Sequence, residues 1–439
     1  MSIHDRVAEL SSDKRRLLAL LMKEKSAGRS PSPMARRPRH SNIQPVSFAQ
    51  QRFWFLNQLE PDSAFHAIPA ALRLSGPLDL TTLEKTFSEL VRRHEILRTL
   101  FPQINGQPVQ LIQDARPLNL RIVDLSDLPA PERDEQARQL TVAEAQQPFD
   151  LSQGPLFRTQ VIRLSVEEHI ILSTMHHIIS DGWSMGVMIN EVAALYAAFA
   201  NGNSSPLPEL PLQYADYALW QREFLSGEVL EEQLSYWKRQ LAGAPAVLDM
   251  PTDRPRPANP TYQGSDESIL IPVELTGKIR KLCRQQEATP FMLLLAAYQA
   301  LLYRYTHQSD ICVGAPVTNR NRTEIENLIG LFVNTLVMRT DLSGEPSFNE
   351  LLKRVKSVAL NAYAHQDLPF EKLVEKLNPD RSLNQISLFQ VLFNMENAQG
   401  EQKDSRDLGG LKFEFLAPEI NLAKYDLTTG GYVAYSAGP

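Results

Sequence analysis

The sequence predicts a mixed α/β (α+β) protein made of two lobes. Helical and strand-like patterns alternate along the whole chain of 439 residues. A cluster of turn-forming residues, Asn201–Pro208, divides the chain near its middle. Segments that interleave helices with strands bury their apolar faces by packing helices on a sheet. A hydrophobic content of 43% provides ample material for such a core.

The elements are assigned in order along the chain. Residues 1–25 are expected to form an amphipathic helix, because apolar residues recur at near-helical spacing among charged neighbours. A linker rich in Ser, Pro and Arg follows at 26–46, and its basic run, residues 34–40, reads as a solvated tether. The first lobe is predicted at 47–213, with helices at 80–97 and 132–147 and strands at 109–112, 156–164 and 169–175. The second lobe is predicted at 214–439, with helices at 214–241, 289–305 and 348–364 and strands at 267–271 and 310–314.

Composition excludes several classes of function. A net charge of −6 argues against a dedicated nucleic-acid-binding protein, whose footprint would be basic. The most apolar run, residues 291–305, is too short to span a bilayer, and the first residues lack the apolar core of a signal peptide. The two cysteines, Cys283 and Cys312, are too few for a four-thiolate metal site and are predicted to be core thiols. We therefore expect a soluble, cytoplasmic protein without a bound metal.

The segment with the clearest chemical content ends a predicted strand with two histidines and a turn, His176-His177-Ile178-Ile179-Ser180-Asp181-Gly182. Successive side chains on a strand point to opposite faces, so the two histidines cannot both face one cavity. Gly182 relieves steric constraint where the chain turns tightly. Asp181 is placed to fix the turn by pairing with an arginine or a backbone amide.

A histidine is suited to chemistry at an amine because its pKa lies near neutrality. It can accept a proton from an attacking amine, or accept a hydrogen bond that aligns it. Two other readings stay open: a histidine beside an apolar strand is often a packed core residue, and a metal site is disfavoured because the two side chains diverge.

Six blocks, in order after residue 46, resemble the condensation domains of non-ribosomal peptide synthetases, which are related in fold to chloramphenicol acetyltransferase. The blocks are Ser47–Leu56, Arg93–Thr99, His176–Gly182, Tyr214–Trp220, Ile329–Thr335 and His365–Glu371. The resemblance implies two chloramphenicol acetyltransferase-like lobes, arranged as a V-shaped pseudo-dimer with a tunnel along their interface. It also implies donor and acceptor substrates held as thioesters on the phosphopantetheine arms of two partner carrier proteins, with no cofactor bound to this chain itself.

The resemblance further implies roles for particular residues. His177 faces the tunnel at the catalytic centre, and His176 and Asp181 support it, with Asp181 bridged to Arg93 or Arg98. The Gly182 amide can stabilise a developing oxyanion. Trp183 and Asn334 are supporting residues, and for Asn334 a hydrogen bond across the cleft and a loop-fixing role are equally open. His365 is expected to be structural, and the run Asn319–Arg322 is expected to form a solvated loop.

The chain departs from the family pattern at its downstream end. Family members continue after a segment like Lys424–Thr428 with another strand and a final helix, whereas here a short tail from Thr429 follows. The second lobe is therefore expected to be truncated at its end, which exposes apolar surface and a sheet edge. No attachment motif for a phosphopantetheine arm is recognised, so carriers are expected to act in trans or from elsewhere in a larger synthetase. The helix at 1–25 fits docking to an upstream synthetase and equally a plain interdomain helix.

Alternative functions remain. The paired histidines argue against a heterocyclisation domain, and the continuation Gly182–Gly186 argues against an epimerisation domain; residues 329–339 favour an L-configured donor. A non-catalytic carrier-binding module would use the same fold. A free-standing acyltransferase acting on a small amine or alcohol would need one carrier or none.

Overall fold

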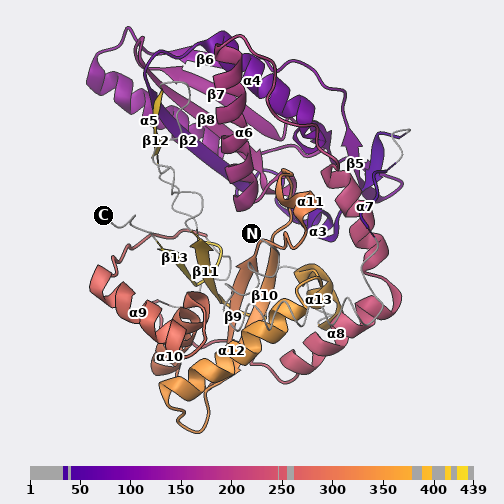
Figure 1. Ribbon diagram of the computed structural model, residues 1–439, viewed down its shortest axis with the longest axis vertical. Coiled ribbons are helices and arrows are strands. Elements are labelled where there is room, and N and C mark those ends of the chain that lie inside the picture. Colours follow the sequence, from indigo (N-terminus) through magenta and orange to yellow (C-terminus); the bar gives the residue numbers. More distant parts are fainter. Residues whose placement is uncertain are drawn as a thin grey trace, which may run out of the picture.

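The computed structural model describes residues 33–37, 41–245, 247–254, 262–377, 388–397, 411–416 and 423–433. It contains two main sheets, each with its own helices, one above the other in Figure 1. The predicted helix at 1–25 and most of the predicted linker at 26–46 lie outside the described residues. The mixed helix-and-sheet class is confirmed, whereas the V-shaped arrangement and the tunnel stay predictions.

The upper sheet has five strands in the order β12-β2-β8-β7-β6. Their bounds are Lys412–Leu416, Ala67–Ser75, Glu168–His176, Phe157–Arg163 and Arg121–Asp124. Strands β2, β8 and β7 pair antiparallel, and β6 pairs parallel to β7. The predicted strands at 156–164 and 169–175 correspond to β7 and β8.

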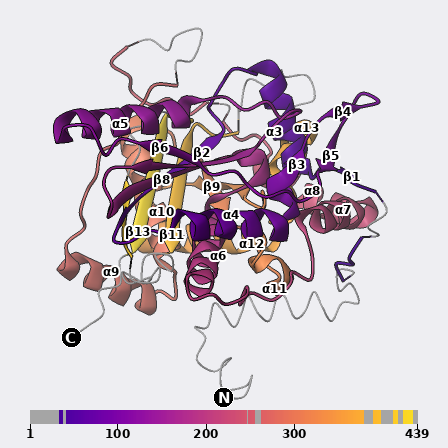
Figure 2. The ribbon, with the colours of Figure 1, turned by 90° about the horizontal axis from the view of Figure 1, so that it is seen from above.

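Helices cover both faces of this sheet (Figure 2). Helices α4 (Leu80–Arg93) and α6 (Gly182–Ala200) lie on one face, and α5 (Ala130–Gln146) lies on the other. A strand covered on both sides has no reason to alternate polar with apolar residues. Accordingly every residue of β8 from His169 to His176 is buried. His176, the first of the two adjacent histidines, is the last residue of this strand.

Helix α3 (Phe48–Leu59) and a small sheet lie beside the histidine turn, residues 176–182. Helix α3 begins with a capping box, in which Ser47 and Gln50 satisfy each other's backbone amides. The Gln50 side chain also donates to the carbonyl of Ile178 at 3.2 Å, which fixes α3 against the histidine turn. A small sheet lies beside them, made of β1 (Ile43–Pro45), β3 (Thr99–Leu100), β4 (Gln103–Ile104) and β5 (Gln107–Ile112).

The lower sheet has the strand order β10-β9-β11-β13. Its strands are Asn334–Asp341, Asp310–Val317, Val391–Asn397 and Leu427–Val433, and its helices include α9 (Val273–Gln285), α10 (Pro290–Thr306), α12 (Phe348–Ala364) and α13 (Phe370–Leu377). The predicted strand at 310–314 and helices at 289–305 and 348–364 are present. Both cysteines are buried in the core, as predicted.

Two predicted elements differ from the structure. The single helix expected at 214–241 is two helices, α7 (Tyr214–Phe224) and α8 (Gly227–Leu241), separated where Gly227 adopts a positive φ of 55°. The strand expected at 267–271 is not one, because no strand among the described residues pairs with it. Ile269 and Leu270 are instead 90% and 92% exposed.

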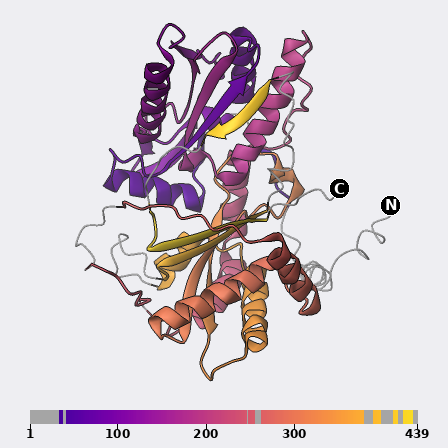
Figure 3. The same ribbon diagram turned by 90° about the vertical axis from the view of Figure 1, so that its left-hand side faces the viewer.

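Two segments of the second half of the chain cross into the first lobe. Strand β12 pairs antiparallel with β2 at the edge of the upper sheet and is the yellow arrow there in Figure 3. The segment of residues 318–333, which we call the crossing segment, places Ile325 and Phe332 in the same hydrophobic core as Leu90 and Ile178. The predicted boundary at residue 214 therefore does not separate the two sheets.

The predicted solvated tether is wrong at Arg37, whereas Arg36 beside it is exposed as expected. Arg37 is 6% exposed, and its guanidinium donates to Asp216 at 2.9 Å and also to Glu95. Asp216 lies in the first turn of α7 and Glu95 begins a 3-10 turn (Glu95–Arg98), so Arg37 joins two elements that carry motif residues.

Candidate active site

His176, the last residue of β8, is a packed residue. It is 2% exposed, and its ring lies 5.7 Å from that of Phe149. Its Nδ1 accepts a hydrogen bond from the amide of Ile178 at 3.0 Å, so this ring is neutral with its proton on Nε2. Burial lowers the pKa of His176 well below its usual value, in agreement with that tautomer.

His177 begins a 3-10 turn (His177–Ile179) directly after β8. Its ring stacks on Phe53 of α3 at 4.9 Å and 24°. The residue is half-buried, and Nδ1 is enclosed without a hydrogen-bond partner. Nε2 is therefore the ring nitrogen left to meet solvent or a substrate.

The environment keeps His177 neutral. Burial, followed by the positive charge of Lys424, lowers its pKa to about 4, against smaller opposing effects of Asp181 and of the backbone of His177 and Ser180. A neutral imidazole can accept a hydrogen bond from an amine. Its pKa lies below the near-neutral value expected from the sequence, which favours aligning the amine over holding its proton.

His66 is a site residue that the sequence analysis missed. It lies just before β2, and its carbonyl accepts a hydrogen bond from the amide of His177 at 2.8 Å. Its ring lies edge-on to Phe53 at 4.9 Å and 6.0 Å from the ring of His176. Burial, followed by the charge of Lys424, lowers its pKa to about 3. Only the pairing of Ala67 with His176 brings His66 here, and no local pattern shows that pairing.

Asp181 is the N-cap of α6 and the centre of a buried hydrogen-bond network. It is 1% exposed and accepts from the amide and hydroxyl of Ser184 at 2.8 and 2.7 Å. Arg320 of the crossing segment forms an ion pair with it at 3.2 Å, and the amides of Phe332 and Val333 donate to it at 2.9 and 3.2 Å. The carboxylate therefore ties the histidine turn to the crossing segment.

The predicted partners of Asp181 were wrong. Arg93 pairs with Glu191 in the middle of α6 through two hydrogen bonds of 3.1 and 3.0 Å. Arg98 donates to the backbone carbonyl of Gln113. Arg93 ends α4, which packs along α6, so it reaches the middle of α6 and not its N-terminus. Arg320, expected in a solvated loop, is 8% exposed.

Gly182 has a different significance from the one predicted. Its φ is not positive, and a Cβ built on it would meet no atom within 4 Å. The turn therefore does not need glycine for steric reasons. As the first residue of α6, its amide belongs to the helix end that has no intrahelical acceptor, where the helix dipole favours negative charge.

The side chains of Trp183 and Asn334 both donate hydrogen bonds to backbone carbonyls and so hold neighbouring segments in place. The Trp183 indole donates to the carbonyl of Glu326 in the crossing segment at 2.9 Å. The Asn334 amide group donates to the carbonyls of Gln366 and Leu368, both at 2.8 Å, and its oxygen accepts from the amide of Phe370 at 2.9 Å. Asn334 thus has the loop-fixing contacts and belongs to the second lobe.

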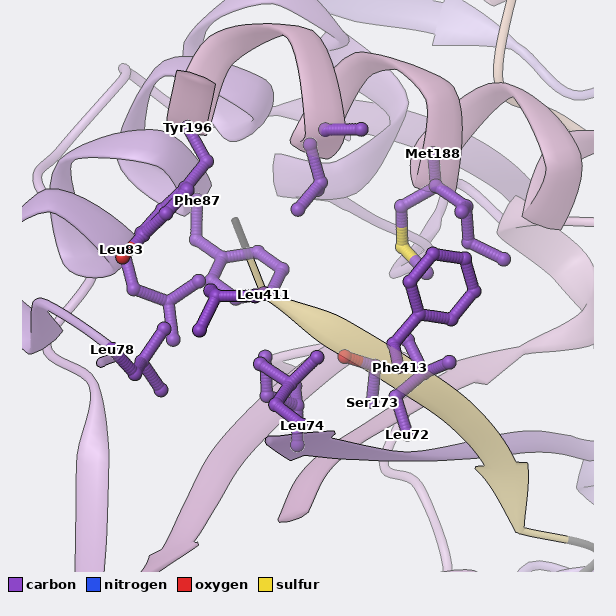
Figure 4. A pocket seen from close by; sticks show the side chains of 14 residues that line it. Leu72, Leu74, Leu78, Leu83, Phe87, Ser173, Met188, Tyr196, Leu411 and Phe413 are labelled. Atoms are coloured by element: carbon purple, nitrogen blue, oxygen red, sulfur yellow. The ribbon is translucent and has the colours of Figure 1, made fainter. Parts of the chain in front are cut away.

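An apolar cavity of the first lobe does not contain the site (Figure 4). It is enclosed by α4, α6 and the sheet, and Ser173 and Tyr196 are its only polar side chains. None of the predicted site residues lines it. Among the described residues no group of three or more His, Cys, Asp or Glu side chains could hold a metal ion.

Residues 40–436 match the family model named Condensation domain. The chain belongs to the condensation-domain family. A linear gramicidin synthase protein of Brevibacillus parabrevis is 52% identical over 384 residues, which are 88% of this chain and 7% of that protein. Phosphinothricin tripeptide synthetase PhsC of Streptomyces viridochromogenes is 40% identical over 433 residues, 97% of this chain and 39% of that protein. The chain thus spans a small part of the length of these relatives.

Solved structures agree with this assignment. The X-domain from teicoplanin biosynthesis is 28% identical, with a TM-score of 0.81 over 92% of this chain and 88% of that one. The first condensation domain of the CDA synthetase is 21% identical with a TM-score of 0.69 over 88% and 89%, and supports the fold alone. The resemblance carried by the six blocks is confirmed.

Helix α6 is long and apolar enough to cross a membrane, alone among the described helices. It packs along α4, and its Glu191 pairs with Arg93 inside the protein. We therefore interpret α6 as a core helix of the condensation fold.

Proposed function

We propose that this condensation domain forms a peptide bond between a donor acyl or peptidyl thioester and an acceptor aminoacyl thioester. Both substrates are held on phosphopantetheine arms of carrier proteins, and the domain itself holds no cofactor. The acceptor amine attacks the donor thioester carbon, the C–S bond breaks, and the amine proton passes to the departing thiolate. The product remains as an amide on the acceptor carrier.

The observation that carries this proposal is the state of His177. It is neutral, half-buried and stacked on Phe53, with Nε2 left free for an amine. In this role Nε2 accepts the amine hydrogen, which aligns the nitrogen lone pair and receives or relays its proton. The amide of Gly182 at the N-terminus of α6 stabilises the oxyanion.

The test is intact mass spectrometry of the acceptor carrier after both loaded carriers are mixed with the domain. We expect a mass gain equal to the donor acyl group, formed about 10²–10⁴ times more slowly by His177→Ala, the range for loss of a general base. His307→Ala, at the exposed C-cap of α10, is the matched control and should keep the full rate. An equal rate for His177→Ala would assign this histidine a supporting role only.

A second candidate is a recruiting module without catalysis. The X-domain of teicoplanin biosynthesis has been solved in complex with OxyB, and that X-domain is 29% identical to this chain with a TM-score of 0.82. The 52% identity to a linear gramicidin synthase protein favours condensation. Carrier binding by the folded domain without any mass gain would favour recruitment.

The partners follow from the same proposal. They are a donor carrier, an acceptor carrier and, through residues 1–25, an upstream synthetase. We propose a cytoplasmic location, without binding to nucleic acid or membrane.

A further inference from the structure

Lys424 is a charged residue near the three histidines that the mechanism so far leaves without a role. Its backbone is held on both sides, because Ala423 donates to the carbonyl of Tyr262 at 2.8 Å and Asp426 donates to that of Gln390 at 3.0 Å. The Nζ atom lies 5.0 Å from the centre of the Phe65 ring, in the first lobe. Lys424 thus reaches from the second half of the chain toward the site.

A chain of aromatic rings connects this ammonium group with His177. The Phe65 ring lies 5.2 Å from that of His66, His66 lies 4.9 Å from Phe53, and Phe53 lies 4.9 Å from His177. The positive charge of Lys424 lowers the pKa of His177, and also those of His66 and His176. The electrostatic effect therefore reaches all three rings.

Lys424 has no counter-ion among the described residues. The charge that acts on Lys424 is the positive charge of Arg52, which repels it. Arg52 is itself paired with Glu371 at 3.3 Å. The charged and titratable groups around the cluster are Arg52, His66, His176, His177, Asp181 acting on His177, Arg158 acting on His176, Glu371 acting on Tyr425, and Glu60 acting on Tyr262. The contact of Lys424 with the Phe65 ring is an attractive cation–π interaction, which orients the ammonium group and leaves its positive charge unneutralised.

Neighbouring protein groups affect Lys424, and the residue is also exposed to solvent. Burial lowers its pKa to about 8, with a further contribution from Arg52, yet the residue retains solvent-exposed surface. The residue is exposed, so a substrate or water can reach its ammonium group. Near neutrality the group remains largely protonated.

We propose that Lys424 stabilises the negative charge that develops on the donor thioester during condensation. This role rests on the proposed function. As the amine nitrogen bonds to the thioester carbon, the carbonyl π electrons move to oxygen; their return breaks the C–S bond and places the charge on sulfur. The proton lost by the amine passes to that sulfur, and Lys424 keeps its own proton throughout. A fixed cation facing this charge lowers the barrier.

Single-turnover condensation rates measured across pH test this role, with Lys424→Met, Lys424→Arg and the exposed Lys353→Met as matched control. We expect Lys424→Met to lower the rate about 10²-fold, as loss of one oxyanion donor does. The wild type should slow as pH rises through about 8, where Lys424 loses its proton. Lys424→Arg should keep most of the rate and lose that alkaline decline, and Lys353→Met should match the wild type.

An NMR titration of the His177 ring gives a readout that does not depend on activity. Because Lys424 holds the His177 pKa down, Lys424→Met should raise that pKa relative to the wild type and to Lys353→Met. Equal condensation rates for wild type and Lys424→Met, or an unchanged His177 titration, would overturn the role of Lys424 alone. Absence of condensation by the wild type would overturn the proposed function, and this role with it.

Discussion

At the scale of the residue, Asp181 connects the histidine turn to a distant part of the chain. Its carboxylate accepts hydrogen bonds from Ser184 on its own helix and from Arg320 and the amides of Phe332 and Val333 on the crossing segment. Arg320 in turn donates to the carbonyls of Ile325 and Leu328 at 2.6 and 2.7 Å. The position of His177 therefore depends on side chains outside its own motif.

Replacement of Arg320 by methionine should strongly destabilise the domain. It would leave Asp181 buried without its counter-ion, and breaking one partner of a buried pair costs about 3–5 kcal/mol. Urea unfolding measures the loss. Arg92→Met is the matched control, because the Arg92 pairs with Glu89 and Glu209 are exposed and worth about 0–1 kcal/mol. Similar losses in both variants would contradict the importance of the buried pair.

The sequence predicts His177 as the central residue of the site but does not predict the residues around it. The pattern of an apolar strand that ends in two histidines, Asp181 and Gly182 is local, so it can be read from the chain directly. The pairing of Asp181 with Arg320 joins residues 139 positions apart, and the sequence analysis chose the arginines of a neighbouring block instead. His66 and Lys424 were missed for the same reason, since only tertiary structure brings them to the histidines.

At the scale of the element, the crossing segment packs closely on α7. The Tyr214 hydroxyl donates to the carbonyl of Leu331 at 2.6 Å and shares a hydrogen bond of 2.9 Å with Ser47. A Cβ on Gly330 would lie 2.0 Å from Cδ2 of Tyr214. Only glycine allows this approach, and Tyr214 is fully buried, so it cannot move aside freely.

Replacement of Gly330 by alanine should therefore overpack this junction and cost about 1–3 kcal/mol. Gly186→Ala is the matched control: Gly186 lies inside α6 with open space around a Cβ, and alanine there should stabilise by about 0.5–1 kcal/mol. Thermal melts of both variants test the pair. A melting temperature for Gly330→Ala at or above that of the wild type would refute the close approach.

Elements with strong local signals were predicted well. Helix α12 spans Phe348–Ala364 as expected, because its amphipathic pattern begins after a capping box between Ser347 and Glu350. The run at 267–271 shows the limit of this reasoning. Its apolar residues have the composition of a strand, but a strand exists only with a partner, and local sequence does not name one.

At the scale of the whole molecule, β12 couples the two lobes. It comes from the second half of the chain and forms the edge of the first sheet, with Phe413 opposite Leu74 and Phe415 opposite Leu72. Leu411, just before it, is 4% exposed and belongs to the core of the first lobe. The stability of the first lobe therefore depends on residues that the sequence placed in the second.

Leu411→Ala should lower the free energy of unfolding by about 2–5 kcal/mol, as core Leu-to-Ala changes do. Hydrogen exchange should locate the effect, with faster exchange at the amides of Ala71–Ser75 on β2. Lys412→Ala, exposed and adjacent, should change stability by no more than about 0.5 kcal/mol. Unchanged exchange along β2 in Leu411→Ala would mean that β12 does not support this edge.

The pairing of β12 with β2 also determines when the first sheet can be completed during synthesis, and which residues a chimeric enzyme must keep together. A ribosome makes residues 412–416 after all the other strands of the first sheet, so the edge of β2 stays open until most of the chain has emerged. A hybrid enzyme spliced near residue 214 would take β2 from one parent and β12 from the other. In such a hybrid, β2 and β12 fit each other only if the paired residues Leu72, Leu74, Phe413 and Phe415 all come from the same parent.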